Sequence, residues 1–396
     1  MAKQPGGTPT EVFVAFLKLG LTSFGGPIAH LGYFRDELVV RRRWIDEAGY
    51  ADLVALCQFL PGPASSQVGF ALGLLRAGPL GGFAAWAAFT LPSAILLLMF
   101  AMSATAFDGP LGSGLLHGLK IVAVAVVAQA VWGMARSLAP DRERASIALA
   151  AVAIVVFAAG ALGQITALLV GMLAGLVFCR SGTVADTTHL SFQVSRGVGA
   201  ACLVTFIVLL VGLPLAAAIA GSQGVNLFDA FYRSGSLVFG GGHVVLPLLQ
   251  AEVVTPNWIS NDVFLAGYGA AQAVPGPLFT FAAYIGATME SPPNGITGAI
   301  IGLIAIFLPG FLLLVGALPF WNSFRRLPMA QAGMRGANAA VVGILGAALY
   351  SPVWTSAILN AYDFTLALTG FLLLAVWKAP PWLVVVLMGL GGMLLS

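Results

Sequence analysis

The chain has 396 residues, of which 59% are hydrophobic and only 8% carry a charge, and its formal net charge is +3. Soluble domains are about one quarter charged, so this composition excludes a soluble protein. A net charge this small gives no reason to expect a nucleic-acid partner. The sequence therefore predicts an all-α polytopic membrane protein that lies in the lipid bilayer.

Nine apolar runs are each predicted to cross a hydrocarbon core of about 30 Å as a helix. The shorter runs need help from the residues that flank them. In chain order, the nine runs are Leu80–Ala104, Leu115–Met134, Ala145–Ala159, Ala161–Phe178, Val198–Ala220, Gly298–Leu318, Ala332–Leu349, Thr365–Trp377 and Trp382–Leu395.

The strongest signal in the sequence is an internal repeat, whose two copies lie about 215 residues apart. The repeat divides the chain into two related halves, 1–180 and 226–396. A polar linker and one extra apolar run, both within 181–225, join these halves. The matched positions are Lys18 with Arg233, Phe24-Gly25-Gly26 with Phe239-Gly240-Gly241, Glu37 with Glu252, Trp44-Ile45 with Trp258-Ile259, Gln58 with Gln272, Pro61-Gly62-Pro63 with Pro275-Gly276-Pro277, Leu91-Pro92 with Leu308-Pro309, and Lys120 with Arg335.

The loops that follow the two glycine motifs differ in charge. The first loop contains Arg35, Arg41, Arg42 and Arg43, whereas its counterpart, residues 250–262, has no Lys or Arg. By the positive-inside rule, the first loop is cytoplasmic and the second lies outside. Equivalent loops on opposite sides predict two inverted-topology repeats, as in many secondary transporters. Parallel repeats are the alternative.

The glycine and proline motifs interrupt helices that are too short to cross the core. Val12–Phe24 has 13 residues, which make a helix of about 20 Å. Ala48–Leu60 and Ala64–Leu75, on either side of a Pro-Gly-Pro motif, are equally short. We therefore expect broken half-helix hairpins that enter the membrane, turn at the motif and leave on the same side. Kinked but complete spans are the alternative.

Such breaks predict an anion site near the middle of the membrane. A half-helix that begins at Pro27, Pro63 or Pro277 has Pro at its first helical position, which suits that residue. Its first N–H groups lack partners within the helix and carry the positive end of the helix dipole. Irregular backbone at this depth is tolerated only where it is buried in protein or lines a cavity. The alternative is that these prolines and glycines only kink packed helices.

The candidate substrate-binding residues are the motif residues together with the cations, hydroxyls and amides beside them. Cations inside a membrane are costly and are functional candidates by default. The alternative for these cations is that they reach the interface or pair with a carboxylate such as Asp229. The candidate set is Lys18, Ser23, Phe24, Gly25, Gly26, Pro27, Gln58, Pro61, Gly62, Pro63, Ser65, Ser66, Gln67, Arg233, Phe239, Gly240, Gly241, Gly242, Gln272, Pro275, Gly276, Pro277, Thr280 and Tyr284. The candidates for gating or indirect support are His30, Glu37, Lys120, His243, Glu252 and Arg335.

The sequence predicts no metal site, no cofactor and no enzyme activity. Cys57, Cys179 and Cys202 lie in apolar surroundings and lack the spacing of metal ligands. The chain has four histidines and no HExxH pair, so neither a zinc site nor a Cys/His cluster is indicated.

Four stretches of the sequence resemble a known family. FLKLGLTSFGGPIAHLGYF and QFLPGPASSQVG resemble the first domain of the chromate ion transporter family in its long two-domain form. FGGGHVVLPLL and QAVPGPLFTFAAYIG resemble its second domain, so the likeness covers nearly the whole chain. Gly242 and Tyr284 stand where the first half has Pro27 and Gln67. The two halves are therefore expected to contribute unequally to the site.

The resemblance implies a multi-pass protein of the bacterial inner membrane that exports chromate, a sulfate-like tetrahedral dianion, and confers chromate resistance. Inverted halves predict alternating access to a shared site. The alternatives are transport of sulfate or another oxyanion, and an anion channel that uses the same half-helix termini. A homodimer is possible, and the sequence leaves the counter-ion open.

Overall fold

The computed structural model describes residues 6–103, 109–158, 160–180, 192, 194–321 and 327–395. All secondary structure in these ranges is helical, and they contain no strand. This confirms the all-α polytopic class. Most of the predicted linker, residues 181–191, lies outside the described residues, as do Ala104 and Ala159 at the ends of two predicted runs.

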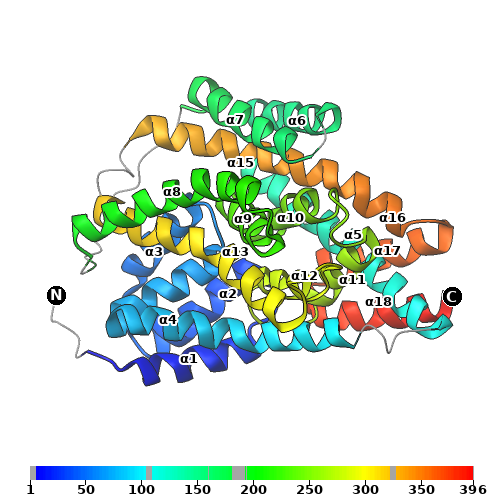
Figure 1. Ribbon diagram of the computed structural model, residues 1–396, viewed down its shortest axis with the longest axis horizontal. Helices are drawn as coiled ribbons and strands as arrows, with labels where there is room; N and C mark the ends of the chain where they lie inside the picture. The colour runs from blue at the N-terminus through cyan, green and yellow to red at the C-terminus, as the bar shows by residue number, and fades with distance from the viewer. Residues whose placement is uncertain are drawn as a thin grey trace.

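The first half begins with short helices and continues with long ones (Figure 1). Its first helix starts where the Thr8 side chain accepts a hydrogen bond from the Glu11 N–H, with Pro9 at the first helical position. The elements are α1 (Pro9–Thr22), α2 (Gly26–Phe34), the π-helix η1 (Arg35–Arg41), α3 (Glu47–Phe59), α4 (Ala64–Met102), α5 (Pro110–Leu138), α6 (Arg142–Phe157) and α7 (Ala161–Phe178).

The second half follows the same order after a connecting helix, α8 (Arg196–Ala220). Short helices again surround the glycine and proline motifs, and long helices follow them. The elements are α9 (Gln223–Ser236), η3 (Gly242–Val244), α10 (Val245–Val253), α11 (Asn261–Ala271), η4 (Leu278–Thr280), α12 (Phe281–Ala287), α13 (Gly295–Ala317), η5 (Leu318–Phe320), α15 (Pro328–Ala348), η6 (Leu349–Trp354), α16 (Thr355–Ala357), α17 (Ala361–Ala375) and α18 (Pro381–Leu395).

The short helices of the first half form two hairpins whose open ends meet at Trp44. The guanidinium groups of Arg42 and Arg76 lie over the Trp44 ring, 5.8 and 5.6 Å from its centre. Arg76 also pairs with Glu11 in the first turn of α1, at 3.1 Å. The chain thus turns at each motif and returns toward Trp44.

Helix α4 folds back on itself. Ala77 and Gly78 have backbone angles that are not helical. Gly73 and Gly81 face each other across this bend, so closely that a Cβ on either residue would collide with the main chain of the other. Residues 64–76 therefore belong to the hairpin, while the part of α4 after the bend runs away from Trp44.

The second half contains the matching contacts. Glu290, the counterpart of Arg76, donates its main-chain N–H to the carbonyl of Trp258, the counterpart of Trp44, at 3.1 Å. Gly286 and Gly298 pack against each other as closely as the glycines at the bend in α4 do. The hairpins of the second half therefore also open at one end, beside Trp258.

The two open ends lie at opposite ends of the helix bundle. Phe100, near the far end of α4, stacks on Tyr284 with 5.6 Å between ring centres. Tyr284 belongs to α12, which returns to the second open end. Lys120, in the first part of α5, pairs with Asp262 at the start of α11 at 3.0 Å. Helix α4 thus runs from the first open end to the second.

The long helices exchange partners between the halves (Figure 1). Helix α15 of the second half packs against α6 and α7 of the first, where Gly171 and Gly175 meet the main chain at Gly336. Helix α5 of the first half packs against α17 and α18, where Gly118 meets Gly392. Small residues allow this close approach of helices in a membrane. The two halves therefore form one interleaved bundle.

Six helices of the described residues are long and apolar enough to cross a membrane. Three further helices are apolar but shorter, namely Leu278–Ala287, α17 and α18. Helix α6, which covers most of the predicted run Ala145–Ala159, has 16 residues. The six long ones are Ala64–Met102, Gly112–Leu138, Ala161–Phe178, Arg196–Ala220, Gly295–Phe320 and Pro328–Ala357. The chain is therefore a multi-pass membrane protein.

Candidate anion-binding site

Two reciprocal hydrogen bonds join the broken segments of the two halves. The main-chain N–H of Gly62 donates to the carbonyl of Val238 at 2.8 Å, and that of Gly276 donates to the carbonyl of Ser23 at 2.8 Å. Each Pro-Gly-Pro motif thus binds the end of the first helix of the other half. The four breaks predicted from the sequence therefore meet at one place.

Glycine is required at both Pro-Gly-Pro turns. Gly62 has a φ of 122° and Gly276 a φ of 98°, a region that residues with a Cβ rarely adopt. A Cβ at Gly62 would lie 3.1 Å from the Gly310 Cα, and a Cβ at Gly276 would lie 2.8 Å from the Ser93 Oγ. Each turn thus packs against a long helix of the opposite half. The Gly62 turn lies beside Pro309 of α13, and the Gly276 turn lies beside Pro92 of α4.

The starts of two half-helices face each other at this place. A Cβ at Gly242 would lie 3.3 Å from Pro27 Cγ, and these two residues occupy equivalent positions in the repeat. Pro27 lies in the first turn of α2, and Gly242 begins η3, which continues into α10. The first N–H groups of such helices lack partners within the helix. Two positive dipole ends therefore converge near the axis that relates the halves.

Several predicted polar residues have structural partners. Gln67 Nε2 donates to the Gly310 carbonyl at 2.9 Å and to the Pro61 carbonyl at 3.1 Å. The Thr280 hydroxyl donates to the Pro277 carbonyl at 2.7 Å. These two side chains stabilise the turns themselves.

The other predicted amide and hydroxyl side chains differ in burial. Gln58 is exposed, and the half-buried Gln272 donates to the Tyr268 carbonyl at 3.4 Å. Ser23, Ser65 and Ser66 are buried. The three serines therefore lie in the interior, where a polar group needs a partner.

The predicted match of Tyr284 with Gln67 is wrong. Tyr284 stacks on Phe100, a residue of the long helix that runs from the first half. Phe70 of the first half stacks in the same manner on Phe311 of α13, with 4.6 Å between ring centres. At the offset of 214 residues that relates Gly62 to Gly276, Phe281 takes the position of Gln67 and Tyr284 that of Phe70. Its hydroxyl donates to the Val263 carbonyl at 3.1 Å, so it serves packing in the second half.

Lys18 and Arg233 are both paired with glutamates at equivalent positions. Lys18 Nζ lies 3.0 Å from a carboxylate oxygen of Glu37, and Arg233 lies 2.8 Å from Glu252. Arg233 also pairs with Asp229 at 2.9 Å. The sequence leaves this pairing open as an alternative to substrate binding. Each pair joins the helix that enters a break to the segment that returns from it. The two cations therefore hold the two arms of each hairpin together.

Three of the candidates for gating, Lys120, Arg335 and His243, have partners that the repeat does not match. Lys120 pairs with Asp262 at 3.0 Å. Its counterpart Arg335 donates to the Cys179 carbonyl at the end of α7, at 2.8 Å. His243 Nδ1 lies 2.7 Å from the Tyr268 hydroxyl. The repeat is therefore symmetric at the breaks and asymmetric at its outer contacts.

Sequence reasoning missed two polar residues of α4 near the breaks. The Ser93 hydroxyl donates to the Thr90 carbonyl at 3.1 Å, and both residues are buried. Ser93 follows Pro92, which leaves a carbonyl of the helix without its usual donor. The matched Leu-Pro pairs at Leu91 and Leu308 were the signal that these helix centres face the breaks.

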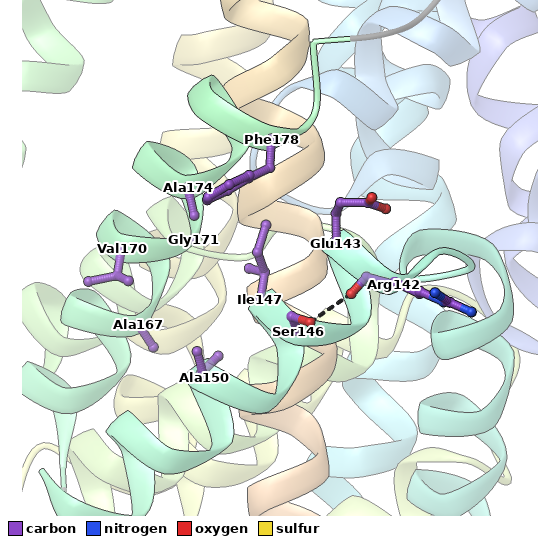
Figure 2. Close-up of a pocket in the computed structure, with 11 residues that line it drawn as sticks. Arg142, Glu143, Ser146, Ile147, Ala150, Ala167, Val170, Gly171, Ala174 and Phe178 are labelled. Carbon is purple, nitrogen blue, oxygen red and sulfur yellow. Dashed lines mark hydrogen bonds between the residues drawn. The ribbon is translucent and has the colours of Figure 1, made fainter.

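One cavity of the described residues lies away from the breaks. It occupies about 460 Å³ between α6 and α7, and its lining includes Ile147, Val170 and Phe178 (Figure 2). The view shows Arg142 and Glu143 at one end of this groove. None of the predicted site residues lines it, so it is not the candidate site.

Comparisons with known proteins identify the family. A family model described as chromate transporter matches residues 10–178 and 225–393. The chain is 30% identical to the chromate transport protein of Pseudomonas aeruginosa over 350 residues, which cover 85% of this chain and 79% of that protein. It is 27% identical to the chromate transport protein of Cupriavidus metallidurans, over 86% of this chain and 82% of that protein.

Half of the chain is enough to match one shorter relative. The uncharacterized transporter YwrA of Bacillus subtilis is 32% identical over 177 residues, which are 43% of this chain and 97% of that protein. No solved structure matches the chain. Since the family model covers the breaks of both halves, the chain belongs to the chromate transporter family of membrane proteins.

Proposed function

We propose that this protein exports chromate across the bacterial inner membrane by alternating access and thereby confers chromate resistance. The observation that carries the proposal is the meeting of four breaks through the reciprocal bonds of Gly62 and Gly276. Helix N-termini that converge inside a bundle bind anions. Relatives named chromate transport proteins over most of their length support chromate as the substrate.

The arrangement of the open ends supports two inverted repeats, residues 1–180 and 226–396. The hairpins of the first half open beside Trp44, next to the arginines of the first loop. Those of the second half open beside Trp258, at the other end of α4. Inverted halves around one site are the architecture of many secondary transporters, in which either end opens in turn.

An asymmetry between the halves supports alternating access. In the second half, α11 is closed against α5: Leu265 is buried, and the Leu119 carbonyl leaves no room for a Cβ at Gly269. In the first half, the equivalent positions on α3, Ala51 and Ala55, are exposed. We take the structure as the state that is open at the cytoplasmic end and closed at the outer end.

The ion pairs at the two ends follow the same asymmetry. Lys120 and Asp262 join α5 to α11 at the outer end, beside Trp258. At the cytoplasmic end, Glu47 at the start of α3 pairs with Arg35 at 2.7 Å, while Arg335 binds the end of α7. In the opposite state, we expect α3 to close toward α15 while the Lys120 pair separates.

Export has a driving force in the membrane potential. Moving one charge through 100 mV is worth about 2.3 kcal/mol. A dianion that leaves a negative interior therefore gains about 4.6 kcal/mol at that potential. Chromate export thus needs no second ion on energetic grounds.

The test is uptake of labelled chromate into inside-out membrane vesicles, with sulfate, molybdate and phosphate as competitors. We expect saturable uptake that falls to background in the Gly62→Val variant. Gly212→Val on α8 is the matched control, because nothing lies within 4 Å of a Cβ at that position. Uptake that never saturates would indicate a channel, and uptake no greater than in Gly62→Val vesicles would refute chromate transport.

A further inference from the structure

We infer that the first half alone supplies the polar side chains that bind the oxyanion, namely Ser23, His30, Ser65 and Ser66. The inference rests on the proposed oxyanion transport and places the ion to one side of the axis that relates the halves. It adds His30 as a binding residue and removes the second half from direct side-chain contact with the ion.

The first argument is a cluster of buried polar atoms without partners. Ser23, His30 and Ser66 are 0%, 1% and 2% exposed. The Ser23 and Ser66 hydroxyls and His30 Nε2 have no hydrogen-bond partner among the described residues. Buried side-chain polar atoms are nearly always hydrogen-bonded, so three unpaired ones point to a missing ligand.

The second argument is that these residues are neighbours. His30 Nδ1 lies 3.4 Å from the Ser65 hydroxyl, which places the ring at the first turn of α4, where Ser66 follows. The Ser23 carbonyl, which accepts from the Gly276 N–H, lies beside the same ring. On its other side, the ring packs edge-to-face on Phe89, with 5.3 Å between ring centres. The imidazole is thus held between the two breaks of the first half.

The chemistry of this cluster suits an oxyanion. When the Ser65 hydroxyl donates to His30 Nδ1, Nε2 carries the ring hydrogen and is a donor. The Ser23 and Ser66 hydroxyls are two further donors. The first N–H groups of α4 add the positive end of a helix dipole. The site therefore presents several neutral donors to oxygen atoms.

The third argument is that the second half has lost this chemistry. Val238, Val245 and Phe279 occupy the positions of Ser23, His30 and Ser65, and all three are buried in the apolar core. Thr280 takes the position of Ser66, but its hydroxyl already donates to the Pro277 carbonyl at 2.7 Å. At these four positions, unpaired polar side chains therefore occur in the first half only, and the unpaired buried atoms of the second half lie at other positions, including Ser234 and Asn338.

A matched pair of serine substitutions tests the inference. Ser23→Ala removes an unpaired buried hydroxyl from the first half. Ser234→Ala removes one from the second half, where Ser234 is 2% exposed and its hydroxyl also lacks a partner. We would measure the Kd for labelled chromate by equilibrium dialysis of purified protein, together with the Tm of each variant. Ser66→Ala and His30→Gln complete the first-half set.

We expect Ser23→Ala, Ser66→Ala and His30→Gln each to raise the Kd by about three- to tenfold, the scale of one lost hydrogen bond. Ser234→Ala should leave the Kd within about twofold of the parent value. Two results would overturn the inference and leave chromate transport standing. One is a rise in Kd for Ser234→Ala equal to that of the first-half variants. The other is an unchanged Kd in every first-half variant that keeps a parent-like Tm. A parent protein that does not bind chromate would refute both. Should His30→Gln fail to fold, the two serine variants decide.

Discussion

The ammonium group of Lys18 lies 3.0 Å from a carboxylate oxygen of Glu37, and this contact joins α1 to η1 across the first break. Arg233 and Glu252 make the equivalent contact in the second half. The surroundings of the two pairs differ. Arg41 and Arg42 also bind Glu37, so the first carboxylate has three cationic partners.

Substitution of the two cations should therefore affect stability unequally. Lys18→Gln leaves Glu37 with Arg41 and Arg42, and the Lys18 side chain is 50% exposed, so we expect a loss below about 1 kcal/mol. Arg233→Gln leaves the carboxylates of Asp229 and Glu252, only 6% and 14% exposed, without this cation. We expect a loss of about 2–4 kcal/mol there.

Thermal unfolding of both variants in one detergent measures this difference. Arg233→Lys is the control, because it keeps the charge and loses only the forked geometry. Equal Tm values for Lys18→Gln and Arg233→Gln would contradict the assignment of Arg233 as the cation of a buried carboxylate pair.

The turns at Gly62 and Gly276 should tolerate no branched side chain. Valine at either position meets a backbone angle that it rarely adopts and the main chain of the opposite half. We expect Gly62→Val and Gly276→Val to abolish chromate uptake while protein remains in the membrane. Vesicle uptake and quantitative immunoblotting test this together. Parent-like uptake by either variant would show that the turn is not part of the transport path.

The two helices that differ in exposure should differ in chemical access. In a background without Cys57, Cys179 and Cys202, cysteine at Ala51 should react with a water-soluble maleimide added at the cytoplasmic face. Cysteine at Leu265, which is 0% exposed and belongs to the outer end, should not react with the same reagent added at the outer face. The measurement is the labelled fraction after a fixed time. Equal labelling of the two positions would argue against a structure open at one end only.

The loops that follow the two glycine motifs should be reached from opposite faces of the membrane. Asp36 is 74% exposed in the first loop, and Thr255 is exposed in the second. Single cysteines at these positions should be labelled by an impermeant reagent in inside-out and right-side-out vesicles, respectively. Labelling of both from the same face would refute the inverted arrangement and favour parallel repeats.

The sequence predicted the breaks in the helices because their cause is local. Glycine at a positive φ and proline at a helix start are properties of a few neighbouring residues, and they appear at matched positions such as Gly62 and Gly276. The nine apolar runs were also visible, since each is continuous along the chain. Composition and local pattern therefore determine the class, the helices and the position of the breaks.

The contacts between the breaks were beyond the sequence. Gly62 binds Val238, and Gln67 binds Gly310, so partners lie more than one hundred residues apart and depend on how the bundle closes. Lys18 was expected to bind substrate, and its pairing with Glu37 follows from the return of η1 beside α1. Sequence alone does not give this return path. The loss of Ser23 and His30 from the second copy was readable in the repeat, but its meaning depends on their burial.

The exchange of helices between the halves has a consequence for biosynthesis. Helices α6 and α7 end at Phe178, and α15, which covers them, begins at Pro328. A ribosome therefore completes α6 and α7 well before it makes α15. Until then, α6 and α7 lie in the lipid without their partner. Contacts that are distant along the chain form late and slowly. We expect the last third of the chain to complete folding, and a chain that stops before α15 to be a substrate for membrane proteases.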